Sequence, residues 1–388
     1  MIKQITVDEL RPGMFIHRLE VWWIKNKHIR NQMLVTDPRQ IALLRKEGIQ
    51  QLWIDLNRSV QMPPAPQSVK KAVVRTPFFQ ELDQAQQIFQ QGKPQVMAMF
   101  NEARLGHRLN LAGMLDLVDE IAGSIRREPT ALLSVARLKS HDDYTWLHSM
   151  AVCGLMITLA QKLGLDDKQV LRVGMGGLLH DVGKAAVPLE ILNKPGKLSD
   201  DEFEVMRQHP ITGAQMLMEA EADADLVDIA LHHHEKYDGG GYPHRLKGEE
   251  ISLYSRMAAV CDVYDALTST RVYRKGWTPA EAMHNMLSWR GHFDNQVLHA
   301  FVNAIGIYPV GSLVRLASGR VALVVKAGER SLLRPVVHAF WSLHAQREVK
   351  PERVDLGDSF CTDSIIGAEE SQLWLNADLN RIWALESA

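Results

Sequence analysis

Seven histidine and aspartate side chains in the middle of the chain have the types and grouping of a metal site. They are His148, the adjacent pair His180-Asp181, His209, the pair His233-His234, and Asp262. Imidazole nitrogens with a few carboxylates are ligands that iron, manganese and zinc use, and one carboxylate can bridge two ions about 3.5–4 Å apart. The set therefore predicts two metal ions, and a bridged pair indicates hydrolysis of a phosphoester.

Each of these residues also has an ordinary structural explanation. A single histidine on an apolar helix is more often a core or surface residue than a ligand. The grouping favours ligation, because several of the seven lie at the ends of expected helices, where side chains can converge on one pocket. Asp262 lies inside the apolar run Met257–Leu267, where a carboxylate is costly to bury unless a cation or a donor meets it.

The elements that must position these residues are mostly helical. Apolar residues recur at helical steps from about residue 79 to about residue 306. Ser199 with Glu202 and Thr278 with Glu281 have the pattern of capping boxes, which start helices. The apolar stretch Met150–Ala160 predicts a buried helix, because it is shorter than the roughly 20 residues that span a bilayer.

Short strand-like runs lie at both ends of the chain, and prolines mark a linker after the first group. The runs are 14–17, 19–24, 33–35 and 52–54 near the start, and 312–316 and 321–325 near the end. We therefore expect a mainly α protein. Its predicted parts are a β-rich N-terminal module (1–58), a Pro-rich linker (59–78), a helical connector (79–129), an all-α domain that carries the ligands (130–310) and a small β-rich C-terminal extension (311–388).

Composition excludes several classes of partner and location. The 388 residues carry a formal charge of −2, so no long-range basic field attracts duplex nucleic acid. Three widely spaced cysteines fit reduced thiols better than a disulfide framework, which predicts a cytoplasmic protein. The first 25 residues lack the apolar core of a secretory signal, and no segment is expected to span a membrane.

The motifs around the candidate ligands resemble those of the HD-GYP family of bacterial cyclic di-GMP phosphodiesterases, within the HD metal-dependent phosphohydrolase superfamily. The resemblance covers roughly residues 130–310, and residues 5–14 are similar to an uncharacterised domain often found ahead of HD-GYP domains. The motifs are His180-Asp181-Val182-Gly183-Lys184, His209-Pro210, the run 233–243 that ends in Gly-Tyr-Pro, and the run 259–269 around Asp262.

This resemblance implies an HD-type helical bundle in which the seven residues bind metal and Asp181 bridges. Fe(II) and Mn(II) are the expected ions, and ligand type does not separate them. A subset of the family binds a third metal through a glutamate four residues before the first histidine. Tyr144 occupies that position here, which predicts two ions.

The resemblance also implies cleavage of cyclic di-GMP to pGpG, and further to GMP in some members, by a hydroxide held between the two metals. Asp181 and Lys184 would be the catalytic residues. Lys184, Arg271 and Arg274 match the family's phosphate-binding positions, although the two arginines also fit a solvated helix end. In the Gly-Tyr-Pro loop, Gly241 and Tyr242 either contact the substrate or shape its pocket.

Other functions and partners stay open from the sequence. The same fold can serve as a non-catalytic sensor or adaptor for cyclic di-GMP, or as a phosphodiesterase for another cyclic dinucleotide such as cyclic GMP-AMP. A diguanylate cyclase or another signalling protein is a candidate partner through the Gly-Tyr-Pro loop or the N-terminal module. Pairing of two chains into a homodimer is also open.

Overall fold

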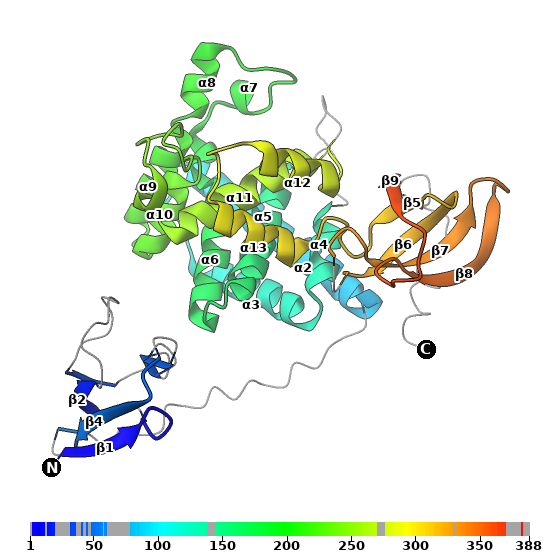
Figure 1. Ribbon diagram of the computed structural model, residues 1–388. Helices are drawn as coiled ribbons and strands as arrows, with labels where there is room; N and C mark the ends of the chain where they lie inside the picture. Colours follow the sequence, from blue (N-terminus) through cyan, green and yellow to red (C-terminus); the bar gives the residue numbers. More distant parts are fainter. Residues whose placement is uncertain are drawn as a thin grey trace. The chain divides into compact units, whose positions relative to one another are not determined.

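The computed structural model divides the chain into two units, residues 1–72 and 73–388 (Figure 1). Each unit has a hydrophobic core of its own. The mainly helical fold class with small sheets toward both ends is confirmed. The structure describes residues 2–11, 14–19, 32–35, 40–41, 44–45, 48–56, 58–59, 78–137, 144–269, 276–328, 331–369 and 382.

The first unit contains a four-stranded antiparallel sheet in the order β1-β4-β2-β3. Its strands are β1 (Ile2–Thr6), β2 (Phe15–Leu19), β3 (Met33–Leu34) and β4 (Gln51–Asp55). Strand β1 was not expected from the sequence, because it is an edge strand in which Ile5 alone is buried. Most of the predicted run 19–24 lies outside the described residues.

The second unit is a helical bundle around a buried helix, α5. Every described side chain of α5 up to Ala160 is buried, as the apolar run predicted. Helix α6 can pack closely against it at Gly177, where a Cβ atom would lie 3.0 Å from Cys153 Cα. No helix in the described part of the chain is long and apolar enough to cross a membrane. The helices are α2 (Phe78–Arg104), α3 (Ala112–Arg127), α4 (Pro129–Arg137), α5 (Tyr144–Lys162), α6 (Asp167–Leu179), α7 (Leu189–Leu192), α8 (Asp200–Met206), α9 (His209–Glu219), α10 (Ala224–His232), α11 (Leu253–Thr268), α12 (Pro279–Ser288) and α13 (Asn295–Ile305), with the 3-10 helices η2 (Val182–Ala186) and η3 (Gly248–Glu250).

Hydrogen-bonded caps start several of these helices. The predicted capping boxes at Ser199 and Thr278 are both present. Asp166 forms a further, unpredicted capping box with Gln169 at the start of α6. Each cap satisfies backbone N–H groups that would otherwise lack a partner in the first helical turn.

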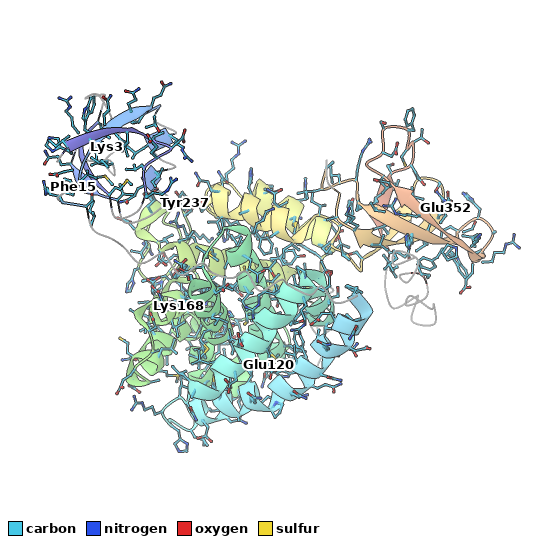
Figure 2. All side chains as sticks on the ribbon, turned by 90° about the horizontal axis from the view of Figure 1, so that it is seen from below. Lys3, Phe15, Glu120, Lys168, Tyr237 and Glu352 are labelled. Atoms are coloured by element: carbon cyan, nitrogen blue, oxygen red, sulfur yellow. The ribbon has the colours of Figure 1, made fainter. Side chains whose placement is uncertain are left out.

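A five-stranded antiparallel sheet completes the second unit, in the order β8-β7-β6-β5-β9. Its strands are β5 (Leu313–Leu316), β6 (Arg320–Lys326), β7 (Val336–Ser342), β8 (Arg347–Asp355) and β9 (Ile365–Ala368). Strands β5 and β6 form the hairpin that the two β-branched runs predicted. The sheet shares a core with Phe78 of α2 and Ala131 of α4, and Figure 2 marks Glu352 on its strand β8.

Candidate metal centre

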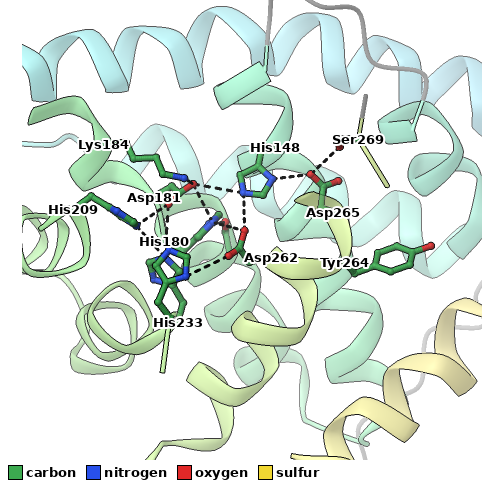
Figure 3. A network of polar contacts seen from close by, with 12 residues as sticks. His148, His180, Asp181, Lys184, His209, His233, Asp262, Tyr264, Asp265 and Ser269 are labelled. Carbon is green, nitrogen blue, oxygen red and sulfur yellow. Dashed lines mark hydrogen bonds and ion pairs between the residues drawn. The ribbon is translucent and has the colours of Figure 1, made fainter. Parts of the chain in front are cut away.

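Five helices bring the predicted ligands to one place (Figure 3). His148 lies on α5 and Asp262 on α11, while His209 is the first residue of α9. The pair His180-Asp181 lies at the end of α6 and the pair His233-His234 at the end of α10, and the side chains of both pairs meet at the same place.

The seven side chains form two groups, each suited to one cation. Asp181, His209, His233 and His234 make the first group, and His148, His180 and Asp262 make the second. Within each group the candidate ligand atoms all lie within 4.8 Å of one another. Six of the seven side chains are buried, and His234 is partly exposed.

The carboxylate of Asp181 lies between the two groups. Its Oδ2 atom is 3.5 Å from Nε2 of His148 and 3.4 Å from Nε2 of His180. Its Oδ1 atom is 3.3 Å from Nε2 of His209 and 3.7 Å from Nε2 of His233. One oxygen therefore faces each group, which is the arrangement a bridging carboxylate needs.

Backbone carbonyls fix the orientation of three imidazoles. Nδ1 of His180 donates to Gly177 O at 2.7 Å, Nδ1 of His209 to Met206 O at 2.7 Å, and Nδ1 of His233 to Ala230 O at 2.9 Å. Each acceptor belongs to the preceding helical turn. With the proton on Nδ1, Nε2 presents its lone pair to the centre, as metal-binding histidines require.

A carboxylate performs the same task for His148. Nδ1 of His148 lies 2.7 Å from Oδ2 of Asp265, which is itself buried. This role of Asp265 was not predicted from the sequence. The available signal was its position three residues after Asp262 on an apolar helix, since residues three apart lie on the same helical face.

The donor set and its charges fit divalent cations. Nε2 of His180 and Oδ1 of Asp181 are buried and have no hydrogen-bond partner among the residues that the structure describes. Burial alone would raise the pKa values of Asp181 and Asp262. Lys184 and imidazoles outweigh burial at Asp181, and imidazoles outweigh it at Asp262, so both pKa values lie well below their ordinary range. The carboxylates are therefore ionised at neutral pH.

The imidazoles respond to the same environment in two ways. Burial lowers the pKa of His233 to about 4, which leaves it neutral with a free electron pair. Burial would also lower the pKa of His180, but the carboxylates of Asp181 and Asp262 raise it to about 10. Nε2 of His180 therefore carries a proton at neutral pH until a cation bound between these carboxylates takes that proton's place.

The predicted substrate-binding residues fall into two sets. Lys184 lies at the centre, with Nζ 2.5 Å from Oδ2 of Asp181, and the ring of Tyr242 lies 4.9 Å from that of His234. Gly241 is buried, and a Cβ atom there would lie 2.3 Å from the backbone nitrogen of Lys236, so glycine lets the loop pack against the chain that follows the histidine pair. Arg271, Arg274 and the side chain of Tyr144 lie outside what the structure describes.

Glu235 holds the Gly-Tyr-Pro loop. It is buried, and its Oε1 atom accepts a hydrogen bond from the backbone nitrogen of His244 at 2.6 Å. The sequence left open whether this side chain orients an imidazole or is an exposed charge at a helix end. The exposed alternative is wrong, and within the described residues Glu235 binds backbone rather than imidazole.

Two family models match the chain. An HD domain model matches residues 125–297, and a model of a domain of unknown function matches residues 2–113. A solved HD-GYP-type protein from Bdellovibrio bacteriovorus is 21% identical with a TM-score of 0.47, and the match covers 78% of this chain and 99% of that one.

Proteins with assigned activities are similar to this chain over different lengths. The chain is 45% identical over 396 residues to a cyclic di-GMP phosphodiesterase of Pseudomonas aeruginosa, with 99% of this chain and 96% of that protein covered. It is 41% identical over 183 residues to a cyclic di-GMP phosphodiesterase response regulator of Xanthomonas campestris, covering 45% and 48% of the two chains. A 3'3'-cGAMP-specific phosphodiesterase of Vibrio cholerae is 36% identical over 157 residues, which cover 40% and 30%. Because the first of these alignments spans nearly all of both proteins, the chain belongs to the HD-GYP family of cyclic di-GMP phosphodiesterases.

Proposed function

We propose that this protein hydrolyses the phosphodiester bonds of cyclic di-GMP to pGpG, and to GMP if the linear product is accepted. The observation that carries the proposal is the pair of ligand groups that share Asp181, in a chain 45% identical over almost its whole length to a cyclic di-GMP phosphodiesterase. Two divalent ions, Fe(II) or Mn(II), are the proposed cofactors.

The two groups would each hold one ion. His209, His233 and His234 would bind the first, His148, His180 and Asp262 the second, and Asp181 both. When bound, such ions lower the pKa of water, polarise the phosphoryl oxygen and neutralise charge that develops in the transition state.

The chain's own residues prepare this site. Three backbone carbonyls and Asp265 hold the imidazoles in the tautomer that presents Nε2, so little rearrangement is needed for binding. The ammonium group of Lys184, beside Asp181, places a positive charge where a scissile phosphate would approach. Tyr242 and Gly241 would shape the same side of the pocket, and Arg271 and Arg274 are proposed to add phosphate contacts.

The regulatory partners are part of the proposal too. The Gly-Tyr-Pro loop and residues 1–130 are the proposed surfaces for a diguanylate cyclase or another signalling protein, and for pairing of two chains. The cytoplasm is the proposed location, because cyclic di-GMP is an intracellular messenger.

The direct test is a product assay on purified protein. The metal-free protein is reconstituted anaerobically with Fe(II) or Mn(II) and incubated with cyclic di-GMP, and the products are separated by chromatography. We expect metal-dependent pGpG that is lost in Asp181→Ala. Asp225→Ala is the control, because this carboxylate pairs with Arg172 at 2.9 Å and belongs to neither ligand group. Measurable binding without turnover would refute the catalytic proposal and favour a sensor or adaptor.

Cyclic GMP-AMP is the second candidate substrate. It is favoured by the similarity to the Vibrio cholerae phosphodiesterase described as specific for 3'3'-cGAMP. The ratio of the two kcat/KM values, measured on one enzyme preparation, decides between the substrates. We expect the larger value for cyclic di-GMP.

A further inference from the structure

Solvent reaches the candidate metal centre beside His234. The side chain of His234 is 23% exposed and that of Lys184 is 22% exposed. The other six ligand side chains are no more than 9% exposed. A phosphodiester must therefore approach the centre past these two residues, which we call the mouth of the site.

At this mouth the ring of Tyr242 lies against the partly exposed imidazole of His234, and the guanidinium group of Arg207 lies over the ring of Tyr242. The rings of His234 and Tyr242 are 4.9 Å apart with an interplanar angle of 31°, and Cζ of Arg207 lies 4.7 Å from the centre of the Tyr242 ring. Arg207 is the C-cap residue that follows helix α8, and it lies two residues before the ligand His209. The face of an aromatic ring attracts a guanidinium group, so this cation is held near the mouth.

Arg207 has hydrogen-bonding capacity to spare. Of the five N–H donors on a guanidinium, one is used in the described part of the chain, by Oε1 of Glu204 at 2.8 Å. The side chain is 29% exposed. Lys184 differs, because its ammonium group already donates to Asp181 inside the centre. The mouth thus has one cation directed to the metal ligands and a second one available to an anionic ligand.

We propose that Arg207 binds the phosphate of the cyclic dinucleotide that is not being cut. This inference rests on the proposed function. The two phosphates belong to one macrocycle, so when one of them lies at the metal ligands the other must lie close to the mouth. A planar guanidinium donates forked hydrogen bonds to phosphate oxygens, and the Tyr242 ring restrains the plane from which it donates.

Arg207→Ala tests this role by comparing two substrates. For cyclic di-GMP we expect KM to rise roughly 10-fold to 100-fold, because one charge-assisted hydrogen bond to the substrate is lost. We expect kcat to stay within about threefold, because the contact is present equally in the ground state and the transition state. Bis(p-nitrophenyl) phosphate has a single phosphate, so its kcat/KM should not change. Arg207→Lys keeps the charge without the planar stack and should lie between wild type and Arg207→Ala.

Lys194→Ala is the matched control. Lys194 lies before α8 and pairs with Glu202 of that helix at 2.6 Å. This variant therefore also removes one positive charge and one ion pair next to α8, but the cation that lies over Tyr242 is Arg207, not Lys194. Its KM for cyclic di-GMP should equal that of wild type. An unchanged KM in Arg207→Ala overturns the proposal, and so does a parallel loss on both substrates, which would indicate a structural role.

Two further measurements separate the remaining explanations. Inhibition of cyclic di-GMP cleavage by cyclic di-AMP should weaken in Arg207→Ala by the same factor as the binding of cyclic di-GMP. A loss of affinity for cyclic di-GMP alone would mean that Arg207 contacts the guanine base, and would overturn the phosphate assignment. Affinity for cyclic di-GMP is measured by calorimetry alongside turnover. If the wild type binds cyclic di-GMP without cleaving it, the proposed function fails. The ratio of the Kd values of Arg207→Ala and wild type still tests the role of Arg207. Absence of any binding would overturn both.

Discussion

Asp265→Ala is expected to weaken one ligand group and to leave the other close to wild type. Oδ2 of Asp265 lies 2.7 Å from Nδ1 of His148, and the two residues are 5% and 2% exposed. Removing this carboxylate frees the imidazole to rotate and lowers the basicity of its Nε2 atom. Loss of such a supporting carboxylate typically reduces metal affinity 10-fold to 100-fold, or about 1.4–2.8 kcal/mol.

The selectivity of this loss follows from the geometry. His148 belongs to the group with His180 and Asp262, whereas the imidazoles of the other group are oriented by backbone carbonyls or lie near the mouth. Asp265→Asn keeps an oxygen that can accept from Nδ1 and removes only the charge. Its loss of affinity should therefore be smaller than that of Asp265→Ala, below about tenfold.

Titration of the metal-free protein with Mn(II), with free Mn(II) followed by electron paramagnetic resonance, resolves the two classes of site. Asp228→Asn is a matched control, because Oδ1 of Asp228 lies 2.7 Å from Nδ1 of His232, a histidine in neither ligand group. We expect two binding classes in wild type and in this control, and one strongly weakened class in Asp265→Ala. Equal weakening of both classes, or none, would refute the reasoning.

Three further predictions concern stability. In Gly183→Ala the new Cβ atom would lie 2.0 Å from the backbone oxygen of His209. We therefore expect the unfolding free energy, measured by urea denaturation, to fall by about 2 kcal/mol or more, and the metal content, measured by elemental analysis, to fall as well. Arg127→Leu would leave the fully buried Glu81 without the guanidinium that now donates to both its oxygens at 2.7 and 2.8 Å; a loss of about 3 kcal/mol is expected, and unchanged stability would contradict it. Burial would raise the pKa of Asp228, but its hydrogen bonds outweigh burial and lower it. The stabilisation by ionised Asp228 is therefore present above the unfolded pKa of about 3.9 and is lost as the pH falls through the lower folded pKa. With chelator present, the unfolding free energies of wild type and Asp228→Asn should therefore become equal in acid.

The sequence predicted the structure best at positions where the residue type has few possible structural roles. Asp262 in an apolar run required a partner, and the structure places it 3.0 Å from Nε2 of His148. The capping boxes at Ser199 and Thr278 could also be predicted, because a capping box depends on two residues three apart in the chain. The helical fold class followed from apolar periodicity for the same local reason.

Contacts between distant segments could not be predicted in this way. Asp265 fits the surface of a helix as well as a contact with His148, which is 117 residues away in sequence. Arg207 follows Glu204 at helical spacing and therefore looks like half of a surface ion pair; its contact with Tyr242 depends on how the Gly-Tyr-Pro loop folds back. Strand β1 was missed because an edge strand with one buried side chain shows no alternation.

The shared carboxylate of Asp181 makes the two proposed ions thermodynamically linked. Its two oxygens face different groups, so an ion in one group orders the side chain that the other group also needs. Linkage is reciprocal: whatever the first ion gains or loses by the presence of the second, the second gains or loses equally. Two separate binding classes require this coupling to be smaller than the difference between the intrinsic affinities of the two groups, so half-loaded protein accumulates at low free metal. Activity then follows the occupancy of the weaker group, which sets the metal supply that the enzyme needs.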